Sequence, residues 1–541
     1  MAGMTPPRQH KPVRSVLVTA LTVVVLVSLV QAWRSGLGVA ALWDTVVREY
    51  FFAVVLVVVP LLIAAMAALR PSARTPNEAT WLPDDADGGG EPAAKKGAAK
   101  KGAASIDLHR PVPWLLCFVA ALGVGYGIFV HPYLVGRSYP TTQAEEVTDF
   151  AERAPWVVAN NFAMRDQGDV IGDRENVRFV PAASDGDAAK GEGSSRYGVL
   201  VKERGPLGFG GYEAVQTLNM PTTGPIPGEA SSFCSVPEEM NKRLDTFWPW
   251  HSLSWSIHAQ RPTAHFTRSD AYGYCAGDTP VVVVPLYRYE GFWAVRKAPA
   301  GAAVYTPEGL SVVEDIAPEI EGPTYPLSLA AKQREAINAG GSLADWWGSR
   351  YGYDLTDKDE EDTNQGNESE FLLVRPDKTT AYVSPLTPRG SSQSITAISV
   401  VPGRQDAPEL KPVVINAFPD LPATSTLATS IKESSVHGDS AWTTRWASGM
   451  TVYEILPGRD GHWVASIGQG QAVSYRADIA PDGTITVVNE ETGQSSGGAG
   501  SAGGAGVTVD AGRPLAEMSP EELLSLIADA TAELQSRQAA S

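Results

Sequence analysis

The sequence predicts three transmembrane α-helices, a large extracytoplasmic α+β region built from antiparallel sheets with few helices, and a tethered C-terminal helix. Three observations predict this fold class. The first 131 residues contain three apolar stretches of bilayer length. The residues after them alternate short β-branched runs with turn signals. A Gly/Ser-rich stretch then precedes one last amphipathic segment.

The apolar stretches occupy residues 16–32, 51–69 and 113–131. Each has about 17–20 residues with almost no charge, which is the length that the hydrocarbon layer of a bilayer requires. Aromatic residues stand at their edges, as is typical of membrane–water interfaces; they are Trp33, Tyr50, Trp114 and Tyr133. We therefore expect three membrane spans.

Basic residues set the expected orientation. Residues 1–15 and the loop 70–112 hold ten of them, namely Arg8, Lys11, Arg14, Arg70, Arg74, Lys95, Lys96, Lys100, Lys101 and Arg110, whereas the loop between the first two spans holds only Arg34 and Arg48. The positive-inside rule then places residues 1–15 and the loop 70–112 in the cytoplasm. Everything after the third span lies outside the plasma membrane. A signal-peptidase site at Val30–Ala32 is an alternative for the first span, and it leaves this orientation unchanged.

Charge separates the two parts of the chain. The net charge is −18 overall, with +4 in residues 1–131 and −22 in the remainder. Direct binding of nucleic acid is not expected of so acidic a body, because phosphate contacts need clustered Lys and Arg. The lipid bilayer and other envelope proteins, or further copies of the chain, are the expected partners.

The third span contains Gly123 and Gly127, a pair of small residues four apart. This spacing lets two membrane helices approach closely. Self-association, packing on the first two spans and no special role all remain open.

The external region divides into two expected α+β domains, residues 135–323 and 324–492. Strands are predicted at 280–289, 292–296, 303–305, 310–313, 371–374, 380–383, 451–456, 463–467, 472–479 and 484–488, with turns at Pro307–Gly309, Pro376–Asp377 and Pro481–Gly483. Helices are predicted at 142–154, 238–246 and 327–338. The segments 290–294 and 460–464 resemble each other, so an internal duplication is one interpretation.

Three cysteines are present. Cys117 lies in the third span and is expected to be an inert apolar residue. Cys234 and Cys275 lie in the external region, where the oxidising environment favours a disulfide over two free buried thiols.

Two segments of biased composition flank the body. The loop 70–112 is poor in aliphatic residues and is expected to be disordered. A flexible linker over 493–513 leads to an amphipathic helix at 519–536, which begins at Ser519 and Pro520. One stripe of this helix is apolar and consists of Leu523, Ile527, Ala530 and Leu534. Its expected partner is its own body, a second copy or another protein.

No catalytic, metal or cofactor site is predicted. His251, His258 and His265 are seven residues apart, and a strand over 253–257 would point the first two to opposite faces, which does not suit zinc. His437–Ser440 places His, Asp and Ser side by side without the geometry of a hydrolase triad. The acidic run 357–362 does not match a calcium-binding loop, because it lacks the required glycine.

Two functions follow from these features. The first is a membrane-anchored binding or scaffold protein that serves as an accessory component of a cell-envelope assembly for secretion, DNA transfer or wall building. The alternative is an envelope hydrolase with its site near 251–265 or 437–440. The tethered helix, together with the absence of a catalytic sequence pattern, favours the binding or scaffold function.

Overall fold

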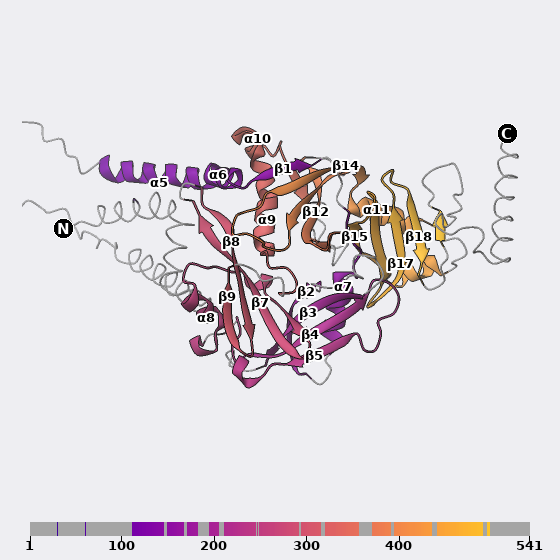
Figure 1. Cartoon of the computed structure of the whole chain (residues 1–541). Coiled ribbons are helices and arrows are strands. Elements are labelled where there is room, and N and C mark those ends of the chain that lie inside the picture. Colours follow the sequence, from indigo (N-terminus) through magenta and orange to yellow (C-terminus); the bar gives the residue numbers. More distant parts are fainter. Residues whose placement is uncertain are drawn as a thin grey trace, which may run out of the picture.

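The structure of the chain is a computed structural model. It describes residues 30, 60, 111–144, 149–166, 170–181, 194–204, 210–244, 246, 248–291, 294–314, 320–355, 371–390, 394–434, 441–490 and 495–497 (Figure 1). The predicted spans 16–32 and 51–69 lie outside this part apart from Val30 and Pro60, and the predicted helix 519–536 lies outside it entirely.

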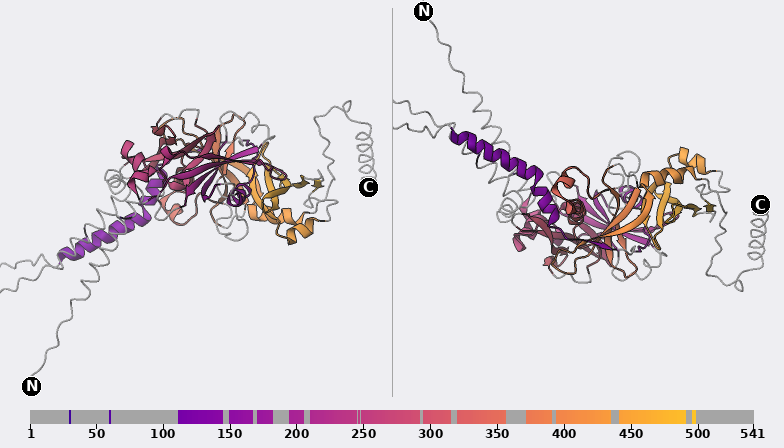
Figure 2. Two further views of the ribbon diagram at one scale, coloured as in Figure 1. Left: turned by 90° about the horizontal axis from the view of Figure 1, so that it is seen from below. Right: turned by 90° about the horizontal axis from the view of Figure 1, so that it is seen from above.

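One long apolar helix leads into the body. α5 (Pro111–Phe129) is followed after Val130 by α6 (His131–Arg137). By length and composition, Cys117–Arg137 is able to cross a membrane, and only 17% of its most apolar window is buried. A core helix of a soluble protein would bury such a surface. Among the described residues this is the one helix of that kind, and it projects from one end of the body (Figures 1 and 2).

Two four-stranded antiparallel sheets pack face to face. The first contains β2 (Gly172–Phe179), β3 (Ser194–Glu203), β4 (Tyr212–Pro221) and β5 (Ser231–Ser235). The second contains β6 (Tyr272–Ala276), β7 (Thr279–Glu290), β8 (Arg296–Thr306) and β9 (Gly309–Val313). Their backbones touch where β3 crosses β6, because a Cβ added at Gly198 would lie 1.8 Å from the carbonyl oxygen of Gly273. Only glycine fits there.

The same two sheets are joined covalently. Cys234 on β5 forms a disulfide with Cys275 on β6, the pairing predicted from the sequence, with the two Cα atoms 6.0 Å apart. A buried core lies between the sheets and includes Leu200, Val215 and Val282. The disulfide therefore closes one edge of this sandwich.

A second sandwich follows. Its six-stranded sheet has the order β1-β14-β13-β12-β10, with β11 also paired to β12; the strands are β1 (Thr141–Ala144), β10 (Tyr353–Leu355), β11 (Phe371–Val374), β12 (Thr380–Pro388), β13 (Ser394–Pro402) and β14 (Val413–Pro422). The facing meander contains β15 (Thr451–Pro457), β16 (Trp463–Gln469), β17 (Ala472–Ile479), β18 (Ile485–Asn489) and β19 (Ser495–Gly497). Phe371, Val383, Trp463 and Tyr475 meet in the core between them.

The helices fill the remaining layers. They are α7 (Trp156–Arg165), α8 (Leu253–Gln260), α9 (Leu327–Ala336), α10 (Leu343–Trp347), α11 (Thr424–Glu433) and α12 (Trp442–Ala447), with short 3-10 turns η4 (Glu238–Met240), η5 (Pro249–His251), η6 (Arg268–Asp270) and η7 (Ile337–Gly340). α7 and α9 pack between the sheet of β2–β5 and the six-stranded sheet, in one core that contains Val158, Tyr197, Leu329 and Tyr382. The two sandwiches therefore share a core.

Several turns and one helix predicted from the sequence are present in the structure. The turn at Pro481–Gly483 joins β17 to β18, and Gly483 has a φ of +82° that favours glycine. The turn at Pro307–Gly309 joins β8 to β9. The predicted helix at 327–338 is α9 continued by η7. The prediction of antiparallel sheets with few helices is confirmed for the described residues.

Four local predictions are wrong. In the predicted strand 292–296, residues 294 and 295 belong to no strand, and β8 begins only at Arg296. The described residues of the predicted helix 142–154, namely 142–144 and 149–154, are not helical. Residues 141–144 are β1, which pairs in parallel with β14, and the amide N–H of Phe150 donates to the carbonyl of Gly458. Pro155 disfavours the helical conformation of the residue before it, so α7 begins only at Trp156. The predicted helix 238–246 is limited to η4. The predicted strand 253–257 is α8, because Ser252 Oγ caps the helix by accepting from the amide of Trp255 at 3.2 Å.

A buried ion pair ties the extended segment before α7 to two sheets. Arg153 Nη2 lies 3.2 Å from Glu454 Oε2 on β15, and the two side chains are 4% and 0% exposed. Arg153 also donates to the hydroxyl of Tyr197 on β3, while the amide of Trp156 donates to Glu454 Oε1 at 2.6 Å. This network sets the position of β15 relative to β3.

Candidate functional site

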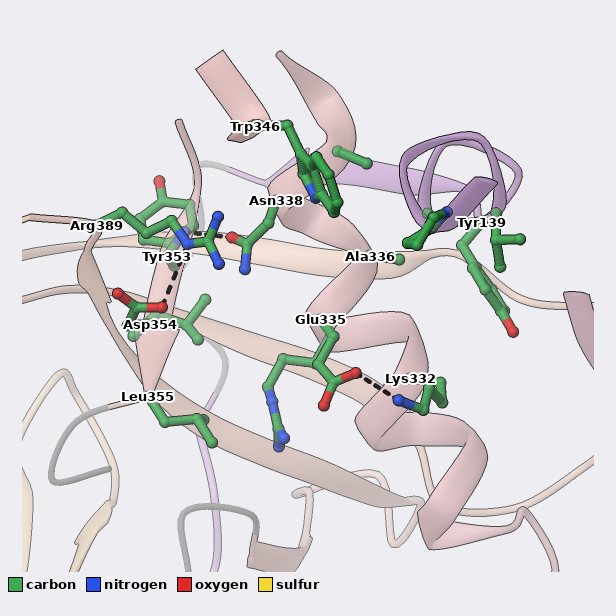
Figure 3. Close-up of a pocket in the computed structure, with 16 residues that line it drawn as sticks. Tyr139, Lys332, Glu335, Ala336, Asn338, Trp346, Tyr353, Asp354, Leu355 and Arg389 are labelled. Atoms are coloured by element: carbon green, nitrogen blue, oxygen red, sulfur yellow. Dashed lines mark hydrogen bonds and ion pairs between the residues drawn. The ribbon is translucent and has the colours of Figure 1, made fainter. Parts of the chain in front are cut away.

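A hollow in the described part of the body lies beside α6, where the apolar helix joins the sheets. Its cavity volume is about 390 Å³, within the range of ligand pockets. The walls come from α6, from α9 with η7 and α10, and from β10 and β12 (Figure 3). Segments far apart in the sequence therefore form one pocket.

Close packing fixes the α6 wall of the pocket. A Cβ added at Gly136 would lie 2.7 Å from Cβ of Ala339, so α6 rests directly on η7. Tyr133 Oη donates to the carbonyl of Gly341 at 2.9 Å. Just after the end of α6, Tyr139 Oη accepts from the amide of Lys297 at 2.9 Å. These contacts leave α6 little freedom relative to the body.

Two ion pairs lie among the residues that line the pocket. Lys332 Nζ lies 2.8 Å from Glu335 Oε2, and Arg389 Nε lies 3.3 Å from Asp354 Oδ1 (Figure 3). Asn338 Oδ1 accepts from the backbone amide of Tyr353 at 2.7 Å (Figure 3). The Arg389–Asp354 pair is the less exposed of the two, with side chains 20% and 40% exposed, whereas those of Lys332 and Glu335 are 55% and 59% exposed.

Aromatic rings complete the lining. Tyr139, Trp346 and Tyr353 border the pocket together with the paired ions. Rings beside oriented charges suit binding of a ligand that has both apolar and polar parts. The described lining residues include no Ser, Thr, Cys or His.

The sequence does not predict this pocket. The Lys332–Glu335 ion pair could be predicted from the sequence, because the two residues are three apart in a correctly predicted helix. The other residues belong to elements brought together only by the tertiary fold. A single sequence carries no signal of that proximity.

The three histidines do not form one site. His258 on α8 and His265 are both buried, with ring centroids 6.5 Å apart, and His265 stacks on Tyr287. His251 lies on η5, where its Nδ1 is 3.0 Å from the carbonyl oxygen of Asn241. Two of the histidines therefore belong to an aromatic core. The described residues contain no group of three or more His, Cys, Asp or Glu side chains suited to a metal ion.

One buried carboxylate has a structural role. Asp270 Oδ2 accepts from Ser328 Oγ at 2.5 Å, and its carboxylate also accepts from the amide of Ser328 in the first turn of α9. Burial raises the pKa of Asp270, while the hydrogen bonds from Ser328 act in the opposite direction. Asp270 thus stabilises the N-terminus of α9.

Of the remaining predicted sites, only the glycine pair on α5 lies within the described residues. Gly123 is buried and Gly127 is exposed on α5, where an added Cβ at Gly127 would meet nothing within 4 Å, so their role in helix packing stays a prediction. Leu523, Ile527, Ala530 and Leu534, the run 437–440 and the acidic run 357–362 lie outside the described residues. The hydrolase alternative likewise stays a prediction.

Comparison with known proteins adds no family to this description. No protein-family model, no curated protein and no solved structure matches the chain.

Proposed function

We propose that the chain is a membrane-anchored extracytoplasmic binding and scaffold protein. More narrowly, it would be an accessory component of a cell-envelope assembly. The observation that carries the proposal is the placement of the two chain connections. α5 enters the body at one end, and the meander of β15–β19, from which the chain leaves after Gly497, forms the opposite end (Figures 1 and 2).

The anchor in this proposal consists of spans at 16–32, 51–69 and 113–131. The N-terminus and the loop 70–112 would face the cytoplasm, and the body would lie outside. Two observations support this arrangement: the exposed apolar surface of α5, and the disulfide between Cys234 and Cys275, which is typical of an oxidising compartment.

The opposite end would carry the partner-binding element. β19 (Ser495–Gly497) pairs with β18, so the first residues of the predicted linker 493–513 are fixed to the meander. A linker of about 15–20 residues spans only ~20–25 Å on average. The helix 519–536 would therefore be presented near the end of the body that lies away from the membrane, where other envelope proteins can reach it.

Crosslinking in the native membrane tests the proposal. The tagged full chain is treated with a mild crosslinker, and the co-purifying proteins are identified by mass spectrometry. The test variant replaces Leu523, Ile527 and Leu534 by Ser; the matched control carries Ser525→Ala and Asp529→Asn, on the opposite face of the same helix.

We expect stoichiometric envelope proteins with the unmodified chain and with the control, and their loss with the test variant. Recovery of the chain alone, or only of further copies of it, would refute the scaffold proposal.

A further inference from the structure

The body exposes few large apolar side chains, and most of them lie in two segments. Within the described part of residues 135–497 the exposed ones are Met164, Ile171, Trp250, Leu343, Trp347 and Tyr351. Three of the six belong to α10 or follow it closely, and Trp250 belongs to η5. Clustered apolar exposure of this kind marks a surface that is covered in the working protein.

α10 lies against the end of the apolar helix. The ring of Trp347 meets that of Phe129, the last residue of α5, edge to face at 4.4 Å between centroids. The neighbouring Trp346 lies 6.0 Å from Tyr133 on α6. Because α6 is also packed on η7 through Gly136, α10 is held at the level where α5 ends.

The length of α5 sets the depth of that level in a bilayer. Its 19 residues extend about 28 Å at 1.5 Å per residue, close to the ~30 Å of the hydrocarbon layer. If α5 spans the hydrocarbon, Phe129 lies at its outer boundary. Trp347, which is 58% exposed and touches Phe129, then lies among the lipid headgroups, the depth that Trp and Tyr favour.

A second aromatic element lies at the same end of the body. η5 carries Trp250, which is 60% exposed and packs 5.1 Å from Trp248. The adjoining α8 stands at the end from which α5 projects (Figure 1). Two exposed basic residues accompany the α10 contact, Arg137 and Arg350, and both suit lipid phosphates.

We propose that this end of the body, formed by α10 with Tyr351 and by η5, rests on the outer leaflet of the membrane. The inference depends on the membrane anchoring proposed above. It adds that the body does not stand away from the bilayer on a flexible stalk but lies on it through Leu343, Trp347 and Trp250. Lipid is the occupant because the patch continues the lipid-exposed surface of α5 through Phe129.

Fluorescence quenching in the full chain tests this contact. The protein is reconstituted into vesicles of equal parts phosphatidylcholine and phosphatidylglycerol, with nitroxide lipids labelled either at the headgroup or deep in the acyl chain. An environment-sensitive fluorophore is attached to Leu343→Cys in a Cys117→Ser background, to Thr426→Cys on α11 in the same background, or to the native Cys117. Thr426 is exposed, and α11, which contains it, lies toward the other end of the body (Figure 1).

We expect headgroup nitroxides to quench the label at position 343 several-fold more than the label at 426. Acyl-chain nitroxides should quench the label at Cys117. Equal quenching at 343 and 426, with Cys117 still quenched, would overturn the inference while the anchoring stands. An unquenched label at Cys117 would instead overturn the anchoring itself.

A second pair of variants excludes a general effect of removing an apolar side chain. Trp347→Ser should reduce the quenching at position 343 several-fold, because it removes the ring that meets Phe129. Met164→Ser, at an exposed apolar residue of α7, should leave it unchanged. Unchanged quenching with Trp347→Ser would contradict the proposed contact.

Discussion

Replacing Glu454 by Gln is expected to destabilise the body strongly, although the two side chains have nearly the same shape. The variant keeps an acceptor for the amide of Trp156 but leaves the guanidinium of Arg153 buried without its carboxylate. At 3.2 Å and an effective dielectric constant of ~20, the lost attraction is about 5 kcal/mol. Breaking a buried pair from one side costs ~3–5 kcal/mol in practice.

Thermal unfolding of the full chain in detergent, followed by tryptophan fluorescence, measures this effect. At about 2–4 °C per kcal/mol, the unfolding midpoint should fall by on the order of 10 °C. The matched control is Asp173→Asn, which breaks the ion pair with Arg204; those side chains are 67% and 59% exposed, so the cost should be at most ~1 kcal/mol.

A double variant tests the cause. Arg153→Met combined with Glu454→Gln leaves no unpaired charge and should recover part of the loss. A midpoint for Glu454→Gln no lower than that of Asp173→Asn would refute the reasoning, because it would mean that the buried guanidinium finds water or another partner at little cost.

Three further predictions concern the sandwich of β2–β9 and the start of α9, and unfolding of the full chain measures each. Replacing Cys234 and Cys275 by Ser should cost about 4 kcal/mol, from the entropy of a 41-residue separation, and a loss below ~1 kcal/mol would contradict this. Gly198→Ala should lower the free energy of unfolding by ~1–3 kcal/mol or more, because the added Cβ meets a backbone carbonyl. Gly228→Ala is the control, since a Cβ at Gly228 would meet nothing within 4 Å. Equal losses of stability in the two variants would contradict this prediction. Burial raises the pKa of Asp270 above its unfolded value, so the contribution of Asp270 to stability falls as the pH rises from about 4 through the raised pKa. Over that range Asp270→Asn should therefore gain stability relative to the parent protein. A stability difference between the two proteins that does not change with pH would argue against this.

Elements whose information is local were predictable from the sequence. The β15–β18 meander follows from alternating β-branched residues and a Pro-Asp-Gly turn, and α9 follows from its apolar spacing. The disulfide followed from compartment and cysteine count alone.

Elements decided by tertiary contacts were not predictable. Residues 142–154 have a helical pattern, but β1 pairs with β14, and the amides of Phe150 and Ala151 donate to the distant carbonyls of Gly458 and Val374. The alternation at 253–257 resembles a strand, yet the cap at Ser252 and burial of Leu253 and Ile257 favour α8. The pocket draws on six elements, α6, α9, η7, α10, β10 and β12, whose contact no local pattern encodes.

Labelling with a membrane-impermeant maleimide in intact cells tests whether the body stands outside a membrane crossed by the N-terminal part. Single cysteines at Thr426 in the body and at Ala98 in the loop 70–112 are compared in a Cys117→Ser background. We expect labelling of Thr426→Cys in intact cells and of Ala98→Cys only after the cells are permeabilised. Labelling of Ala98→Cys in intact cells, or protection of Thr426→Cys until permeabilisation, would contradict it.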